Sequence, residues 1–345
     1  MPGIDERYEN LHRRNISAIN KRIRKIYENS IQEIRVTLST VTYKNKPFNL
    51  ADYPALKKKV DAVAKKMHAS IYAVTVNGIR DSWSISNEKN DVLVDERFKG
   101  KDLNPRVART FYKTNQSALD RFIKRKEKGL NLSDRVWNLL NPFKKELEQT
   151  IGLGLGSGRS AADIASDVKK YLNQPDRLFR RVRSEDGKLH LSAAARDYHP
   201  GQGVYRSSYK NALRLTMTEN NIAYRTADHH RWQEMPFVLG IEVKLSNAHP
   251  RYDICDPLAG TYPKDFKFTG WHPQCLCYQV PKLMNDEDFE EIEDLVLAGE
   301  DPGTIGKGSV TRPPPSFTEY LKQNKGRMEA WKNKPYWMLD NKKYL

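Results

Sequence analysis

Residues 247–281 read NAHPRYDICDPLAGTYPKDFKFTGWHPQCLCYQVP, and this stretch concentrates the metal-binding side chains of the 345-residue chain. It contains all three cysteines and two of the eight histidines, in the order H-x5-C-x16-H-x2-C-x-C. These residues are His249, Cys255, His272, Cys275 and Cys277. Imidazole and thiolate are the usual ligands of tetrahedral zinc. The stretch therefore predicts a loop closed by a structural zinc ion.

The loop between the first and last cysteine is rich in Pro and Gly and poor in aliphatic residues. Ordering it costs about 1–2 kcal/mol per residue in backbone entropy. Zinc ligation supplies on the order of 10 kcal/mol, whereas a disulfide supplies about 2–4 kcal/mol. His272 suits a shared ion because two residues separate it from Cys275, and His249 can serve if the chain folds back. A disulfide, shielded thiols packed by Trp271, Phe266 and Phe268, or no special role are the alternatives.

Composition restricts the class of protein and of partner. The formal net charge is +16, the pI is near 9.5, and the length allows two or three domains. Such a basic chain suits a polyanionic partner, and nucleic acid is the simplest. The basic clusters predict contacts to duplex DNA without sequence preference. Their residues are Arg13, Arg14, Lys21, Arg22, Arg121, Lys124, Arg125 and Lys126.

The chain has no apolar run long enough for a membrane span, and its polar N-terminus, MPGIDERYENLHRRN, does not resemble a secretory signal. We therefore expect the protein to begin in a cytoplasm. Thiols stay reduced there, which favours a metal over a disulfide.

Helical periodicity dominates the first two thirds of the chain. Ile16, Ile19 and Ile23 recur at steps of three and four, as on one face of a helix. Residues 73–105 show no clear pattern. The glycine-rich run 152–158 fails the spacing of a phosphate loop, so we interpret it as a flexible joint. Helices are expected within 4–40 and over 56–72, 107–128, 161–172 and 209–232. A further helix is expected to begin after Ser133 as its N-cap, and Ser160 is the expected N-cap of the helix over 161–172.

The periodicity then changes from helix to strand. Ile241, Val243 and Leu245 alternate with charged residues, which predicts a half-buried strand, and residues 277–280 read as a return strand. The predicted fold class is α+β: a mainly helical body, a small C-terminal β module that carries the Cys/His cluster, and a helical tail. The predicted regions are a basic helical N-terminal region (1–130), a helical body (131–232), the Cys/His β module (233–284), and an acidic helix, Gly/Pro linker and C-terminal tail (285–345).

The β module also carries a family resemblance. Its pattern of Asp, Cys, a Leu-Ala-Gly turn and a closing His-Pro-x-Cys-x-Cys resembles the C-terminal module of the phage Mu F-like head morphogenesis, or minor capsid, proteins. Many members carry a second Cys shortly after the first. Here Asp256 and Pro257 stand there, so His249 or Asp256 becomes the natural substitute ligand. The matching residues are Asp253, Cys255, Leu258, Gly260, His272, Pro273, Cys275 and Cys277, and the resemblance extends over roughly 130–341.

The resemblance implies a virion protein of a tailed phage or prophage. Such a protein is assembled in the host cytoplasm and lies in the head interior or at the portal vertex. Its expected partners are the portal protein, other head proteins and packaged double-stranded DNA, with no membrane and no small-molecule substrate. Thr218 and Glu219 match a Thr-Glu pair of the family, which we interpret as a buried polar clasp that holds a helix to the module.

An enzyme is the alternative function. Cys and His beside a basic body suit a metal-dependent nuclease or a toxin-like protein that acts on DNA. A catalytic metal needs an open coordination position, whereas three thiolates would close the site, and the chain has no His-Asn-His arrangement. Residues 285–345 are too few for an added toxin domain. We therefore expect no enzymatic activity.

Overall fold

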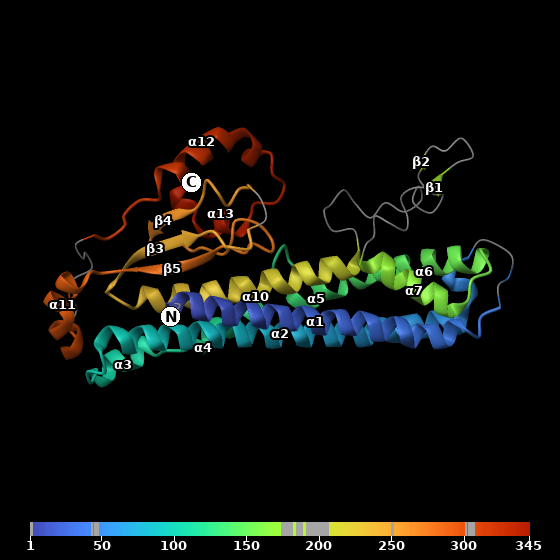
Figure 1. The fold of residues 1–345 in the computed structure, drawn as a ribbon, viewed down its shortest axis with the longest axis horizontal. Coiled ribbons are helices and arrows are strands. Elements are labelled where there is room, and N and C mark those ends of the chain that lie inside the picture. The colour runs from blue at the N-terminus through green and yellow to red at the C-terminus, as the bar shows by residue number, and fades with distance from the viewer. Residues whose placement is uncertain are drawn as a thin grey trace. The chain divides into compact units, whose positions relative to one another are not determined.

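The computed structural model describes residues 3–42, 44, 48–173, 182–183, 189–190, 207–249, 252–300, 302 and 308–345 (Figure 1). The chain is mainly helical and carries a small antiparallel sheet near its C-terminus, as the sequence predicts. The helices are α1 (Ile4–Leu38), η1 (Leu50–Asp52), α2 (Pro54–Phe98), α3 (Pro105–Phe111), α4 (Gln116–Lys124), α5 (Leu132–Trp137), α6 (Leu140–Gly156), α7 (Ala161–Asn173), α10 (Ser208–Gln233), α11 (Asp286–Ala298), α12 (Pro315–Glu329), α13 (Tyr336–Asp340) and η2 (Lys342–Tyr344). The strands are β1 (Val182–Arg183), β2 (Leu189–His190), β3 (Val238–Lys244), β4 (Gly260–Pro263) and β5 (Tyr278–Leu283).

The chain forms two compact units. The first unit, called the module unit below, comprises Met1–Ile16, Gly78–Ile123 and Met217–Leu345, and the second comprises Ser17–Asn77 and Lys124–Thr216. Helices α1, α2 and α10 therefore each contribute residues to both units. The four consecutive regions expected from the sequence stay a prediction.

The three-stranded sheet is the framework of the candidate site. Its order is β4-β3-β5, and both pairings are antiparallel. Ile241 in the central strand pairs with Tyr262 on one side and Pro281 on the other. Ile241 and Val243 are buried, while Glu242 between them is half-buried. The alternation in this part of β3 thus confirms the strand that the sequence predicts.

Helices of the module unit are joined by polar contacts in their interior. Ser86 and Asn90 of α2 donate hydrogen bonds to Asp228 of α10, at 2.7 and 2.9 Å. Lys89 forms a buried ion pair with the same carboxylate at 2.7 Å. A buried carboxylate needs such partners, since its desolvation is costly.

The same polar interior explains why α2 was hard to predict. Its helix continues without interruption through residues 73–98, where the sequence shows no clear pattern. Thr75, Ser82, Ser86 and Asn90 are fully buried there and recur at helical spacing. The inward positions are therefore regular but polar, so hydrophobic periodicity does not detect them.

The single helix predicted over 107–128 is wrong. The structure has α3 and α4 instead, separated by residues 112–115. Thr114 in this break accepts a hydrogen bond from the indole of Trp83 (2.8 Å) and one from Asn87 (3.3 Å), both on α2. Asn115 has a φ of +55°, which an α-helix does not tolerate. Contacts with α2 thus outweigh the helical propensity of this segment.

Two details in the second unit also differ from expectation. Asn131, not Ser133, caps α5, and it forms a capping box with Asp134. The glycine run 152–158 is largely helical, because α6 continues to Gly156 and only the next residues form the joint. Gly154 lies so close to α7 that a Cβ there would be 2.3 Å from Cγ1 of Ile164. The run therefore serves close helix packing, while Ser160 caps α7 as predicted.

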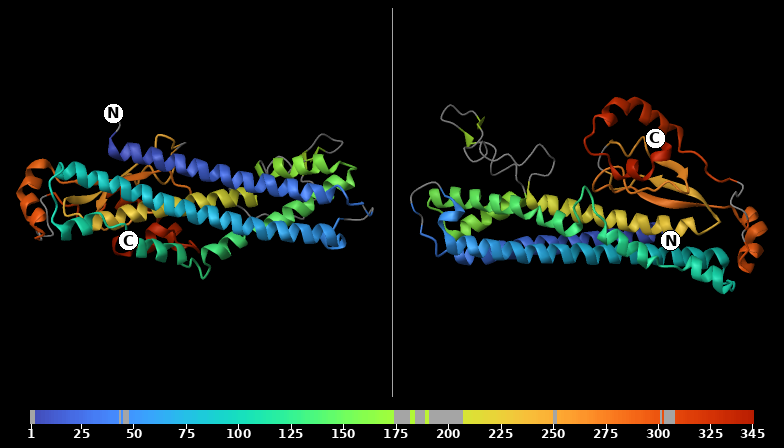
Figure 2. Two further views of the ribbon diagram at one scale, coloured as in Figure 1. Left: turned by 90° about the horizontal axis from the view of Figure 1, so that it is seen from below. Right: turned by 180° about the vertical axis from the view of Figure 1, so that it is seen from behind.

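The C-terminal tail packs on the sheet. Phe317 of α12 contacts Tyr262 and Phe266, with ring centroids 5.6 and 5.7 Å apart. Trp337 of α13 is fully buried and lies edge-on to Trp271. Figure 2 shows the sheet between α10 and these tail helices. The acidic helix α11 buries Phe289 and Val296.

Candidate metal centre

Two turns of the β module bring the cysteines together. Cys255 lies in the segment between β3 and β4, and His272, Cys275 and Cys277 lie in the turn that leads into β5. The amide of Cys275 donates to the carbonyl of His272 (3.1 Å), which makes this turn tight. Because β3 and β5 are paired neighbours, the two turns converge although twenty residues separate their first cysteines.

The geometry fits a tetrahedral ion. The candidate ligand atoms of Cys255, His272 and Cys275 all lie within 4.8 Å of one another. The Sγ atoms of Cys255 and Cys275 are 3.7 Å apart. A tetrahedral zinc with Zn–S bonds of about 2.3 Å places two sulfur ligands about 3.8 Å apart, whereas a disulfide bond is about 2.0 Å long. All three thiols are free and buried, so the cluster has the spacing of a metal site and not of a disulfide.

The three thiols shift one another's pKa. Hydrogen bonds with Cys255 and Cys277 lower the pKa of the Cys275 thiol well below the usual value. The hydrogen bond with Cys275 raises the pKa of the Cys255 thiol, and the pKa of the Cys277 thiol is raised although its hydrogen bond with Cys255 acts to lower it. Cys277 thus adjoins the other two thiols. The buried cluster of Cys255, His272, Cys275 and Cys277 can hold a metal ion.

His272 presents the correct nitrogen for ligation. Its Nδ1 lies 2.8 Å from the carbonyl oxygen of Pro273, to which it donates. In the neutral imidazole this contact selects the tautomer in which Nε2 has a free lone pair, which is the common arrangement of metal-bound histidines. Nε2 lies 3.4 Å from Oδ2 of Asp253. The imidazole is therefore oriented toward other electron-pair donors and not toward a hydrogen-bond donor.

Helix α10 supports the turn that carries Cys275 and Cys277 through hydrogen bonds to its backbone. Arg225, only 5% exposed, donates to the carbonyl oxygens of Thr269 (3.0 Å), Cys275 (2.8 Å) and Cys277 (2.5 Å). Its guanidinium group fills the space beside Gly270, where an added Cβ would lie 2.6 Å from Nη1. Gly270 also has a φ of +104°, a backbone conformation that favours glycine. Arg225 therefore fixes the backbone from which two of the thiols project.

Two further side chains connect the turn to the helices. Asn221 donates to the Cys275 carbonyl (3.2 Å) and accepts from His12 of α1 (2.9 Å). Thr218 accepts a hydrogen bond from the amide of Gln274 (3.1 Å). The polar clasp expected at Thr218 is therefore present, and Glu219 beside it is buried.

His249 belongs to an adjoining set of ligand atoms. It lies in a set with Asp253 and Cys255, whose ligand atoms are within 4.8 Å of one another. Its Nε2 is 2.9 Å from Oδ2 of Asp256, and this hydrogen bond raises the pKa of the imidazole. Only Cys255 is common to both sets. The structure thus brings all five predicted ligands into one module but divides the histidines between two neighbouring positions.

Aromatic side chains pack the loop as well. Trp271, Phe266 and Phe268 are buried, and Trp271 contacts both phenylalanines with ring centroids 6.0 and 5.1 Å apart. Phe268 also lies 5.0 Å from the Arg225 guanidinium carbon. Burial of these rings contributes to the order of the loop beside any metal. Aromatic packing and metal ligation are therefore complementary explanations for the order of the loop.

The residues predicted to bind DNA lie on α1, on α4 and directly after α4. Arg13 is half-buried and pairs with Glu9 at 3.1 Å, and Arg125 is half-buried as well. The other six side chains are exposed to solvent: Arg14, Lys21, Arg22, Arg121, Lys124 and Lys126. They are distributed over both units.

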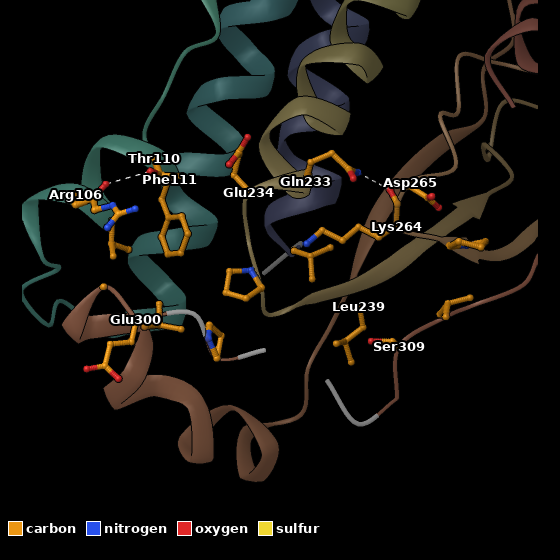
Figure 3. Close-up of a pocket in the computed structure, with 18 residues that line it drawn as sticks. Arg106, Thr110, Phe111, Gln233, Glu234, Leu239, Lys264, Asp265, Glu300 and Ser309 are labelled. Carbon is orange, nitrogen blue, oxygen red and sulfur yellow. Dashed lines mark hydrogen bonds between the residues drawn. The ribbon is translucent and has the colours of Figure 1, made fainter. Parts of the chain in front are cut away.

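A cavity of about 850 Å³ lies elsewhere in the module unit (Figure 3). Its wall includes Arg106, Phe111, Glu234, Leu239 and Lys264, so cations, carboxylates and apolar groups are mixed. The Lys264 amine donates to the carbonyl of Met235 (2.8 Å), and burial lowers its pKa to about 8.

The sequence did not identify the residues that position the backbone of the metal centre. Arg225, Asn221 and His12 lie on distant helices, and no local pattern marks them. Asp253 was detectable, because it forms an H-x3-D-x-C arrangement with His249 and Cys255. A carboxylate at that spacing is a common zinc ligand or support.

Comparison with known proteins identifies no relative: no protein-family model, curated protein or solved structure matches this chain. Within the described ranges, no helix combines the length and the apolar character that crossing a membrane requires.

Proposed function

We propose that this chain is a minor capsid protein of a tailed phage or prophage, which acts in head morphogenesis near the portal. Its Cys/His β module is a structural zinc unit and not a catalytic one. The resemblance of Asp253, Cys255 and the closing His-Pro-x-Cys-x-Cys to phage head morphogenesis proteins supports this function. The expected partners are the portal protein, other head proteins and packaged double-stranded DNA.

The thiolate-rich centre is the observation that carries the structural role. Cys255 and Cys275 have the sulfur spacing of a tetrahedral zinc, and Arg225 anchors their backbone from inside the unit. Thiolates neutralise the ion and fill its coordination positions, which removes the Lewis acidity that hydrolysis needs. A nuclease would instead leave a position open to the scissile phosphate.

The direct test is the protein composition of the phage particle. Particles produced by induction of the parent phage or prophage should contain this chain in few copies, and it should co-purify with the portal protein when both are co-expressed. Detection by mass spectrometry only in the cell lysate, together with no association with the portal, would refute the proposal.

DNA binding is a second test, and it rests on net charge and on the exposed basic side chains of α1 and α4. Mobility shifts with two unrelated duplexes should give equal affinities that fall steeply from low to physiological salt. Lys21→Glu combined with Arg22→Glu should reduce the slope of log K against log salt by about 2, at about 0.9 per lost phosphate contact. Lys322→Glu combined with Lys325→Glu changes the charge equally at exposed positions of α12 and should leave the slope nearly unchanged.

The alternative of a metal-dependent nuclease predicts a different outcome. Purified protein with zinc, manganese or magnesium should leave plasmid DNA intact. Cleavage that disappears in Cys275→Ser would establish an enzyme and overturn the structural interpretation of the centre.

A further inference from the structure

A second set of ligand atoms adjoins the cysteine cluster through Cys255. Nitrogen of His249, a carboxylate oxygen of Asp253 and the thiol of Cys255 lie within 4.8 Å of one another. The first set, with His272 and Cys275, uses the same Cys255. Each set therefore has ligand atoms spread around the space for one small ion, and the two spaces share a ligand.

The Asp253 carboxylate lies between the two imidazoles. Its Oδ2 is 3.4 Å from Nε2 of His272, and its Oδ1 is 3.8 Å from Nε2 of His249. Hydrogen bonds between nitrogen and oxygen are typically at most about 3.2 Å long, so both contacts are longer than a hydrogen bond, although both are within ion-pair distance when the imidazole is protonated. A tetrahedral zinc with bonds of about 2.1 Å places nitrogen and oxygen ligands about 3.4 Å apart. The 3.4 Å contact matches this spacing, and the 3.8 Å contact is somewhat longer but within the 4.8 Å that separates the ligand atoms of the second set.

The tautomer of His272 is consistent with this interpretation. When the imidazole is neutral, Nδ1 donates to Pro273 and the lone pair of Nε2 faces the Asp253 oxygen. Electron-pair donors that face one another repel unless a proton or a metal ion lies between them. The arrangement is therefore compatible with a bound metal.

The second set has one buried ligand, whereas the first set has two. The side chains of His249, Asp253 and His272 are 12%, 35% and 36% exposed, while Cys255 and Cys275 are buried. Three protein ligands leave a fourth position for solvent, as at exchangeable zinc sites. A set of imidazole, carboxylate and thiolate selects zinc-like transition metals over magnesium or calcium. The ion would replace the proton that His249 shares with Asp256.

We propose that the β module binds a second, exchangeable divalent transition-metal ion at His249, Asp253 and Cys255, with Cys255 bridging it to the structural ion. This inference rests on the metal centre of the proposed function. It adds Asp253, which the sequence did not identify as a ligand, and it gives His249 a position distinct from that of His272.

The test is metal stoichiometry of the full chain. Protein prepared without metal, under reducing and anaerobic conditions, is dialysed against buffered zinc and then analysed for zinc and protein. Wild type should bind two ions per chain, and His249→Ala should bind one. Asp253→Asn should also lose one ion, although its amide oxygen can still accept the hydrogen bond from the Cys255 amide (2.6 Å in wild type). Tyr252→Ala is the matched control, because this side chain is 79% exposed in the same loop and should leave two ions.

Each other result has a defined meaning. One ion in wild type, unchanged in His249→Ala, overturns the second site and leaves the structural centre intact. Loss of all zinc in His249→Ala shows that His249 belongs to a single centre and also overturns the inference. No zinc in wild type refutes the metal centre itself. Circular dichroism of each variant with one equivalent of zinc confirms that loss of the second ion is not loss of the fold.

Discussion

Replacement of Arg225 by Met tests whether the cysteine turn depends on helix α10. Met keeps much of the length of the side chain but removes all donors. The carbonyls of Thr269 and Cys277 then lose their bonds to the guanidinium, while the Cys275 carbonyl keeps the Asn221 amide. Hydrogen bonds from a charged donor contribute about 1.5–3 kcal/mol each, which gives about 3–6 kcal/mol for two. Removal of a buried charge offsets part of this loss, so we expect a net destabilisation of about 3 kcal/mol.

The assay is thermal unfolding of the full chain with and without zinc. For a compact unit of this size, about 3 kcal/mol corresponds to a fall of about 6–12 °C in Tm. Arg80→Met is the matched control, because Arg80 is exposed on α2 in the same unit, and surface changes usually stay within about 0.5 kcal/mol. Equal Tm values for the two variants would show that the three carbonyl contacts of Arg225 contribute nothing measurable, and the account of the turn would be wrong.

Two further predictions concern packing and pH. Gly154→Ala should lower the unfolding free energy by about 1–3 kcal/mol, because the new Cβ overlaps Ile164. Gly326→Ala, in open space on α12, should instead raise the unfolding free energy by up to about 1 kcal/mol. Urea denaturation measures both changes, and a change of the same sign in the two variants would contradict the packing argument. Burial lowers the pKa of His12 to about 3, so below its ordinary value of about 6.5 the unfolded chain binds a proton that the folded chain does not. Stability should therefore fall as pH decreases through this window, and the His12 share at pH 5 is about 2 kcal/mol. His12→Gln, which retains a donor for Asn221, should lose that share between pH 7 and pH 5; an unchanged pH dependence would refute the assignment.

Sequence by itself determined the type and order of most elements. Local periodicity is sufficient where the buried face is apolar, as in α11 and the alternating part of β3. The clustering of every cysteine near two histidines likewise located the candidate centre before any geometry was known. These properties depend on residues close together in the chain, so the sequence displays them directly.

Tertiary structure decided what depends on partners far apart in sequence. The polar inward face of α2 is satisfied where Ser86, Lys89 and Asn90 bond the buried Asp228, and the helix predicted over 107–128 is interrupted because Thr114 bonds to α2. The division of the histidines between two sets of ligand atoms follows from the pairing of β3 with β5 and from the support of Arg225. A buried charge or carbonyl is stable only when a specific distant group satisfies it, and such pairings leave no periodic trace in the sequence.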